Sequence, residues 1–182
     1  MRTYKTEGII LKRTNFGEAD KILTIYTRHF GKIKVLAKGV RKTTSRKSGH
    51  LELFNWAQIY LAKGRNLDII TEAETVRSFR GWRKNLAKVG LAYYFCELVE
   101  RLTAENVKNQ EIFNLLCGGL LGLGRARASD LAQASQNFAQ KLLEETGFWP
   151  RGKSTDNLNL EEYIESLIEK KLRAKNIFNL YE

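Results

Sequence analysis

The spacing of hydrophobic residues changes close to residue 80 of this 182-residue chain. Before that point, residues 33–38 alternate apolar with mostly cationic side chains, which is the period-two pattern of a half-buried strand. After it, apolar residues between positions 82 and 103 recur at steps of three and four, as along one stripe of a helix. This change predicts two domains, a β domain over residues 1–80 and an all-α domain over residues 81–182.

Five segments of the first domain have strand-like patterns. They are residues 6–12, 22–27, 33–38, 53–62 and 67–77. Turn-forming residues separate them, and one long connection lies between the third and the fourth. Five short strands in this arrangement predict a small Greek-key barrel of the oligonucleotide/oligosaccharide-binding (OB) type, with an SH3-like barrel as the alternative. The predicted fold class is therefore α+β, with a five-stranded OB-type barrel followed by helices.

The second domain contains four helix-like segments. They are residues 82–103, 109–123, 129–146 and 160–176. Ser129 is the predicted N-cap of the third helix, which we expect to end at Gly147. Asn159 and Glu162 resemble a capping box for the fourth helix.

The apolar segments and the cysteines indicate a location for the chain. The longest apolar stretch, residues 115–123, is interrupted by glycines and falls short of the roughly 20 residues that a membrane span needs. The N-terminus becomes charged too soon for a signal peptide. Cys96 and Cys117 alone do not make a disulfide framework. We therefore expect a cytoplasmic protein.

Residues with catalytic or metal-binding chemistry do not form a recognisable motif. His29 and His50 lie in or beside predicted turns, without a cysteine or carboxylate cluster at ligand spacing. Glu18 and Asp20 share a turn, but two carboxylates beside Lys21 make an incomplete metal site. We therefore expect no enzyme activity, no metal site and no cofactor.

Positive charge is concentrated in the first domain. Residues 1–80 hold 17 bases and 7 acids, a net charge of +10, whereas residues 81–182 hold 14 and 13, a net charge of +1. Residues 32–47 alone hold seven bases and no acid. Cations that release counterions from a phosphate backbone gain affinity, so we expect a nucleic-acid partner, with a merely solvated loop as the alternative. The candidate phosphate contacts, of which Arg41, Lys42 and Arg46 rank first, are Lys12, Arg13, Lys32, Lys34, Lys38, Arg41, Lys42, Arg46, Lys47, Lys63 and Arg65.

Aromatic side chains in the basic domain are candidates for stacking on bases. Such stacking contributes about 1 to 3 kcal/mol per base at single-strand sites. Trp56 and Tyr60 share one face of the segment 53–62, but alternation alone does not show whether that face is buried. The candidate platforms are Trp56, Tyr60 and Phe16.

The first 80 residues also carry a family resemblance. The segments TEGIILKRTNFGEADKILTIYT and FGKIKVLAKGVRKTTSRKSGHLELF resemble the N-terminal domain of RecO, a bacterial recombination mediator. The coinciding positions are Gly8, Leu11, Gly17, Glu18, Ala19, Asp20, Thr27, Gly31, Lys38, Gly39, Val40, Arg41, Ser45, Leu51 and Phe54. The helical domain resembles that family more loosely, through residues 94–98 and 142–150.

One feature departs from the family pattern. Many RecO-like proteins have a four-cysteine zinc module just after the position of residues 147–150, whereas this chain runs through residues 151–157 into its last predicted helix. Tetrahedral zinc needs four ligands, which Cys96 and Cys117 cannot supply alone. We therefore expect a short member of the family that lacks the zinc module.

The resemblance implies a function that composition alone does not. RecO-like proteins bind single- and double-stranded DNA and anneal complementary strands, and they work with RecR and single-strand-binding protein to let RecA load on coated DNA. Two other classes of function stay open. An RNA-binding OB protein would have the same charge and barrel, and a protein–protein adaptor would dock a partner peptide between its helices.

Overall fold

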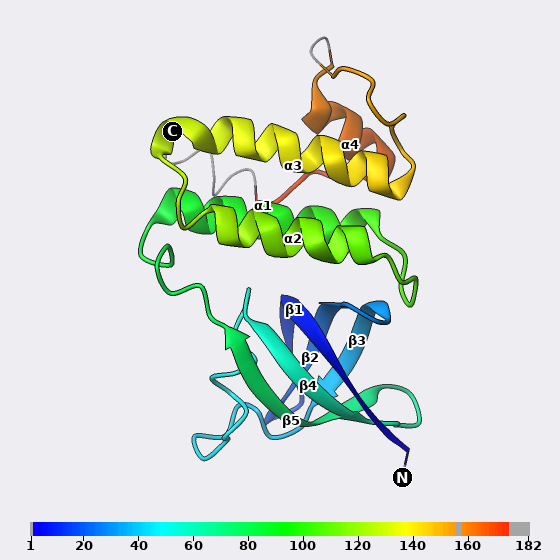
Figure 1. Ribbon diagram of the computed structural model, residues 1–182. Helices are drawn as coiled ribbons and strands as arrows, with labels where there is room; N and C mark the ends of the chain where they lie inside the picture. The colour runs from blue at the N-terminus through cyan, green and yellow to red at the C-terminus, as the bar shows by residue number, and fades with distance from the viewer. Residues whose placement is uncertain (1, 156–157, 175–182) are drawn as a thin grey trace. The chain divides into compact units, whose positions relative to one another are not determined.

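The computed structural model of the chain describes residues 2–155 and 158–174. Within these ranges it contains five strands followed by four α-helices (Figure 1). The chain divides into two compact units. The barrel unit comprises residues 2–78 and Ala104–Phe113, and the helical unit comprises Phe79–Thr103 and the described residues from 114 onward. The predicted division at residue 80 did not assign Ala104–Phe113 to the strands.

The strands of the barrel unit form a closed barrel. They are β1 (Thr3–Phe16), β2 (Asp20–Thr27), β3 (Gly31–Ala37), β4 (Trp56–Ala62) and β5 (Asp68–Arg77). Their order around the barrel is β1-β2-β3-β5-β4. The short β3–β5 pairing is parallel, and the other neighbouring strands are antiparallel. The predicted α+β class with an OB-type barrel before the helices is confirmed.

β1 is longer than the predicted strand because it pairs with two neighbours. Its first half, from Thr3 to Ile9, pairs with β4, and its second half, from Gly8 to Phe16, pairs with β2. Both partners lie beside Gly8, where an added Cβ atom would be only 2.5 Å from Cγ2 of Ile25. Glycine therefore lets β1 pass from one neighbour to the other without a steric clash.

β4 begins at Trp56, three residues later than predicted, because the backbone turns at Phe54. Phe54 has a φ of 70°, which interrupts an extended strand. Its N–H donates to the carbonyl of Ile10 at 3.0 Å, and its side chain is buried. The ends of β2, β3 and β5 lie within two residues of their predicted positions.

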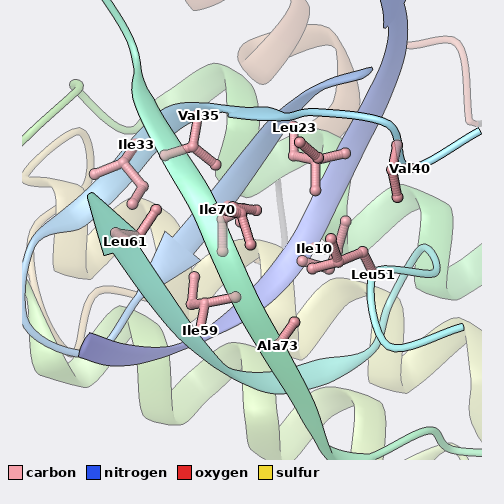
Figure 2. Close-up of a cluster of buried hydrophobic side chains, with 12 residues drawn as sticks. Ile10, Leu23, Ile33, Val35, Val40, Leu51, Ile59, Leu61, Ile70 and Ala73 are labelled. Carbon is pink, nitrogen blue, oxygen red and sulfur yellow. The ribbon is translucent and has the colours of Figure 1, made fainter. Parts of the chain in front are cut away.

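The barrel core includes side chains from the long β3–β4 connection (Figure 2). Val40 and Leu51 lie on either side of the basic stretch 41–47, and only 3% and 0% of their surfaces are exposed. They belong to the same buried cluster as Ile10, Leu23 and Ile70 of the strands. The connection therefore buries apolar side chains at both ends, which its polar composition did not predict.

The segment between the first two helices packs on the barrel. Lys32 and Glu105 form an isolated parallel backbone bridge, and the N–H of Asn106 donates to the carbonyl of Lys32 at 2.8 Å. The hydroxyl of Tyr26 donates to the carbonyl of Asn109 at 3.2 Å. These hydrogen bonds explain why this segment belongs to the barrel unit.

The helical unit is built on close aromatic packing. Its elements are α1 (Leu86–Leu102), most of α2 (Gln110–Gly122), the 3₁₀ turn η1 (Ala128–Asp130), α3 (Leu131–Thr146) and α4 (Leu160–Ile168). Phe95 of α1 stacks on Phe138 of α3, with ring centroids 4.0 Å apart. An added Cβ atom at Gly119 of α2 would lie 3.1 Å from both rings, so glycine permits this packing. Cys96 and Cys117 are buried free cysteines.

Helix ends follow the predicted caps in part. The side chain of Asn159 accepts a hydrogen bond from the N–H of Glu162, and Gly147 ends α3 in the left-handed conformation with a φ of 79°. The prediction for Ser129 was wrong, because its hydroxyl donates to Asp130 within η1 and α3 begins only at Leu131.

Two other helix boundaries also differ from the predictions. α1 begins at Leu86 rather than at position 82, because Asn85 is its N-cap and accepts a hydrogen bond from the N–H of Lys88. α4 ends at Ile168, where Glu169 takes a left-handed conformation, and positions 175–176 of the predicted helix lie outside the described residues. Among the described helices, none has the length and apolar character needed to cross a membrane.

Candidate nucleic-acid interface

The β3–β4 connection, residues 38–55, is a folded loop, and we call it the basic loop. Besides its buried ends, it contains internal turns in which the N–H of Lys42 donates to the carbonyl of Gly39 at 3.1 Å and that of Ser45 to the carbonyl of Lys42 at 3.0 Å. The N–H of Leu51 donates to the carbonyl of Lys47 at 3.2 Å. The cations between these anchors are therefore held on an ordered backbone before any ligand binds.

The basic loop also packs against the β1–β2 turn. The N–H of Arg41 donates to the carbonyl of Ala19 at 2.9 Å, and its guanidinium donates to the carbonyl of Gly17 at 3.1 Å. The N–H of Gly39 donates to the carboxylate of Asp20 at 2.7 Å. Asp20 thus holds the loop backbone, and the two connections form one continuous surface.

Lys21 at the start of β2 belongs to this surface, although the sequence interpretation did not select it. The pKa of its ammonium is lowered first by partial removal from water and then by repulsion from Arg13 and Arg41, while Glu52 opposes the change. The ammonium donates to the side-chain carbonyl of Asn15 at 2.7 Å. The strand register could have indicated Lys21, because it pairs with the residue just before the loop.

Four cations of the basic loop are exposed, and we call them the unpaired loop cations. They are Lys38, Arg41, Lys42 and Arg46. Over residues 2–155 and 158–174, none of the four forms an ion pair with a carboxylate. Like charges on an anchored loop produce a positive potential that an incoming polyanion can neutralise.

Other predicted contacts already have carboxylate partners. Arg13 forms an ion pair with Glu52. Lys34 lies 2.5 Å from a carboxylate oxygen of Glu105, which the packed segment brings to β3. Their positive charges are therefore partly neutralised within the barrel unit.

Two further lysines of the basic run are buried or half-buried. Lys32 is buried at the start of β3. The ammonium of Lys47 donates to the carbonyl of Ile70 on β5 at 2.8 Å, and its burial lowers its pKa. This bond ties the loop to β5, just after the last residue of β5 that pairs with β3. Lys47 therefore stabilises the loop.

The predicted contacts Lys63 and Arg65 lie on the β4–β5 hairpin, residues 63–67, and not on the basic loop. The N–H of Lys63 donates to the carbonyl of Arg2, which precedes β1, whereas the basic loop packs on the turn that follows β1. The ammonium of Lys63 lies 2.8 Å from Asp68 and 4.9 Å from the ring centroid of Tyr4. Arg65 is exposed, as is Lys12 in the middle of β1. The structure therefore does not gather all eleven predicted cations.

The three predicted stacking platforms have different surroundings. Phe16 is 51% exposed and lies directly before Gly17, which accepts the guanidinium bond from the basic loop. Trp56 donates its indole N–H to Glu7 at 3.1 Å and packs edge-on against Phe113 with centroids 6.1 Å apart. Tyr60 is half-buried on the same outward face of β4. Phe16 is thus the platform best placed to meet a base.

Both histidines have hydrogen-bond partners on threonines of the barrel unit. Nδ1 of His50 accepts a hydrogen bond from the N–H of Thr75 at 3.1 Å, and Nδ1 of His29 lies 3.1 Å from the hydroxyl of Thr6. In the described part of the chain, no group of three or more histidine, cysteine or acidic residues is placed to hold a metal ion.

Comparisons with known proteins place both units in one family. Residues 1–79 match the family described as "Recombination protein O N terminal", and residues 83–155 match the one described as "Recombination protein O C terminal". The DNA repair protein RecO of Roseiflexus sp. (strain RS-1) is 41% identical over 150 residues, which cover 82% of this chain and 52% of that protein.

Relatives from two other bacteria give similar values. The DNA repair protein RecO of Pelotomaculum thermopropionicum is 41% identical over 150 residues, covering 82% of this chain and 57% of that protein. The DNA repair protein RecO of Dehalococcoides mccartyi (strain ATCC BAA-2266 / KCTC 15142 / 195) is 40% identical over 147 residues, which cover 81% of this chain and 57% of that protein. The chain thus spans about half the length of the curated relatives that it matches.

Proposed function

Because this chain belongs to the RecO family of DNA repair proteins, we propose that it binds DNA through the unpaired loop cations and anneals complementary strands in recombinational repair. The observation that carries this proposal is the anchored basic loop. Buried Val40 and Leu51 fix its backbone, and its four exposed cations have no carboxylate partner among the described residues. Each cation that contacts a phosphate releases counterions, and the ordered backbone reduces the entropy lost on binding.

The proposed mechanism is neutralisation of the DNA backbone. The unpaired loop cations and Lys21 contact phosphates of a single strand, and Phe16 stacks on a base of the same strand. Phosphate contacts carry no sequence information, so pairing between the bases selects the complementary strand. With these five contacts to a single strand, affinity falls on the order of 10²-fold between 50 and 200 mM salt.

The proposal extends to the partners and location of the family. We propose that the chain binds single- and double-stranded DNA, acts in the cytoplasm at the nucleoid, and works with RecR and single-strand-binding protein to help RecA load on coated DNA. In this role the protein brings strands together and breaks no covalent bond.

A strand-annealing assay tests this function. Two complementary labelled oligonucleotides are mixed with the protein, either bare or coated with single-strand-binding protein. Annealing of coated strands supports the mediator function, and failure on both substrates contradicts it. The matched variant Lys38→Gln/Arg41→Gln/Lys42→Gln/Arg46→Gln should anneal much more slowly because four phosphate contacts are removed. Competition by an RNA oligonucleotide of the same sequence distinguishes DNA annealing from an RNA-binding function.

A further inference from the structure

The helical unit also carries concentrated positive charge, although its overall charge is close to balance. Its two segments 79–88 and 120–130 contain six basic residues and one acid, Asp130. The basic residues are Arg80, Arg83, Lys84, Lys88, Arg125 and Arg127. None of them belongs to the basic loop.

The fold of the helical unit brings these two segments to the same end of its helices (Figure 1). The indole N–H of buried Trp82 donates to the carbonyl of Leu120 at 2.9 Å, so the segment before α1 is fixed to the last turn of α2. The guanidinium of Arg83 lies 5.8 Å from the centroid of the Trp82 ring. Beyond α2 the chain turns at once, because the N–H of Arg125 donates to the carbonyl of Gly122 at 3.0 Å.

Four of these basic residues are exposed, and we call them the helical basic end. They are Arg80, Lys84, Arg125 and Arg127. None of the four has an ion-pair partner within the described ranges. The carboxylate of Asp130 accepts hydrogen bonds from the backbone N–H of Arg127 and the hydroxyl of Ser129. One carboxylate beside four cations leaves the group with a positive net charge.

Cations elsewhere in the helical unit are arranged differently. Arg101 pairs with Glu97, and a carboxylate oxygen of Glu145 lies 3.1 Å from the guanidinium of Arg151. Lys171 lies 3.9 Å from Glu165. The unit therefore has acidic residues available for ion pairing, but they do not lie at the helical basic end.

We propose that the helical basic end is a second polyanion site, which binds the phosphate backbone of another nucleic-acid strand. This inference rests on the proposed function, since annealing requires that two strands be held together. Phe79 and Trp82, the aromatic residues of these two segments, are both buried, so the site recognises phosphates without base stacking and takes single strands and duplexes alike. The surface of the basic loop differs because Phe16 is exposed there.

The test is capture of a second strand by the full chain. Protein is bound to an immobilised oligo-dT, and a labelled, non-complementary oligo-dT is then added. The helical variant is Arg80→Gln/Lys84→Gln/Arg125→Gln/Arg127→Gln. Its charge-matched control on the same unit is Lys141→Gln/Arg151→Gln/Lys170→Gln/Lys171→Gln, and thermal melting confirms that both are folded.

We expect the helical variant to bind the first strand with an affinity within about twofold of the wild type. For capture of the second strand, the slope of log affinity against log salt concentration should fall by about 2.8, or about 0.7 per lost contact. The control should capture like the wild type. Unchanged capture by the helical variant, or equal loss in variant and control, overturns the inference. Absence of first-strand binding in the wild type would instead contradict the proposed function, so the two failures are distinguishable.

Discussion

The basic loop and the β4–β5 hairpin are both rich in cations, but their charges have different surroundings. In the loop, buried Val40 and Leu51 fix the backbone, and the exposed cations between them have no carboxylate partner in the described structure. In the hairpin, Asp68 accepts hydrogen bonds from Lys63, from the hydroxyl of Tyr4 and from the backbone N–H of Gly64. The comparison shows that the position of acidic residues, more than the number of basic ones, decides which cations are ion-paired, and we propose that the unpaired ones bind phosphate.

Removing an apolar anchor of the loop should have the largest effect. Leu51→Ala deletes a fully buried side chain and should lower the free energy of unfolding by about 2 to 5 kcal/mol, as measured by urea denaturation. Leu53→Ala, at a half-buried position nearby, should cost less. If Leu51→Ala left stability unchanged, the loop would not be anchored in the core.

Neutralising the unpaired loop cations should have the next largest effect. In the variant Lys38→Gln/Arg41→Gln/Lys42→Gln/Arg46→Gln, single-strand affinity near 0.1 M salt should fall by on the order of 10²- to 10³-fold, because four counterion-releasing contacts are lost. Fluorescence anisotropy with a labelled oligonucleotide measures this change. Lys47 is kept, because its bond to Ile70 makes it part of the loop structure. A loss smaller than about fivefold in a folded variant would contradict the assignment.

Phe16→Ala tests the aromatic side chain beside the loop. We expect a loss of about 1 to 3 kcal/mol in binding to single strands, because stacking on a base is removed. Binding to a duplex, whose bases are already stacked, should change little. Trp56→Phe serves as the control, since the indole is held by Glu7 and Phe113. Equal losses on single and double strands would argue against stacking.

Lys63→Gln should have the smallest effect on DNA and a visible effect on acid stability. Burial alone would raise the pKa of Asp68, but hydrogen bonds from Lys63, Tyr4 and Gly64 outweigh it and leave the pKa lowered. A lowered carboxyl pKa stabilises the fold above the unfolded value of about 3.9, and this stabilisation is lost as pH falls through the lower folded pKa.

The Lys63→Gln variant should therefore unfold at a higher pH than the wild type in an acid titration followed by circular dichroism. Its single-strand affinity should stay within about twofold, since an ion-paired lysine has less to gain from phosphate. An affinity loss as large as that of Arg46→Gln would remove the distinction between hairpin and loop.

Much of the fold follows from the sequence, because hydrophobic period and turn residues are local signals. They predicted the β-then-α order, the five strands and the end of the third helix at Gly147. The turn at Phe54 was missed, because its positive φ depends on contacts with β1 that strand alternation does not reveal.

The candidate site was less predictable, because the state of each cation depends on residues distant in the sequence. The basic run was visible, but Lys34 is paired by Glu105 and Lys47 is bound by Ile70. Lys21 was not selected, although strand pairing brings it beside the loop. No local sequence pattern shows which residue, distant in the sequence, each cation contacts.

The most direct test of the central claim compares two double variants that remove the same net charge. Arg41→Gln/Arg46→Gln removes two unpaired loop cations, and Lys34→Gln/Lys63→Gln removes two paired ones. The measurement is the slope of log affinity against log salt concentration for a single-stranded oligonucleotide. The account predicts that the first pair reduces the slope by about 1.4 and that the second changes it by less than about 0.5. Equal reductions would contradict it, because net charge alone would then determine binding.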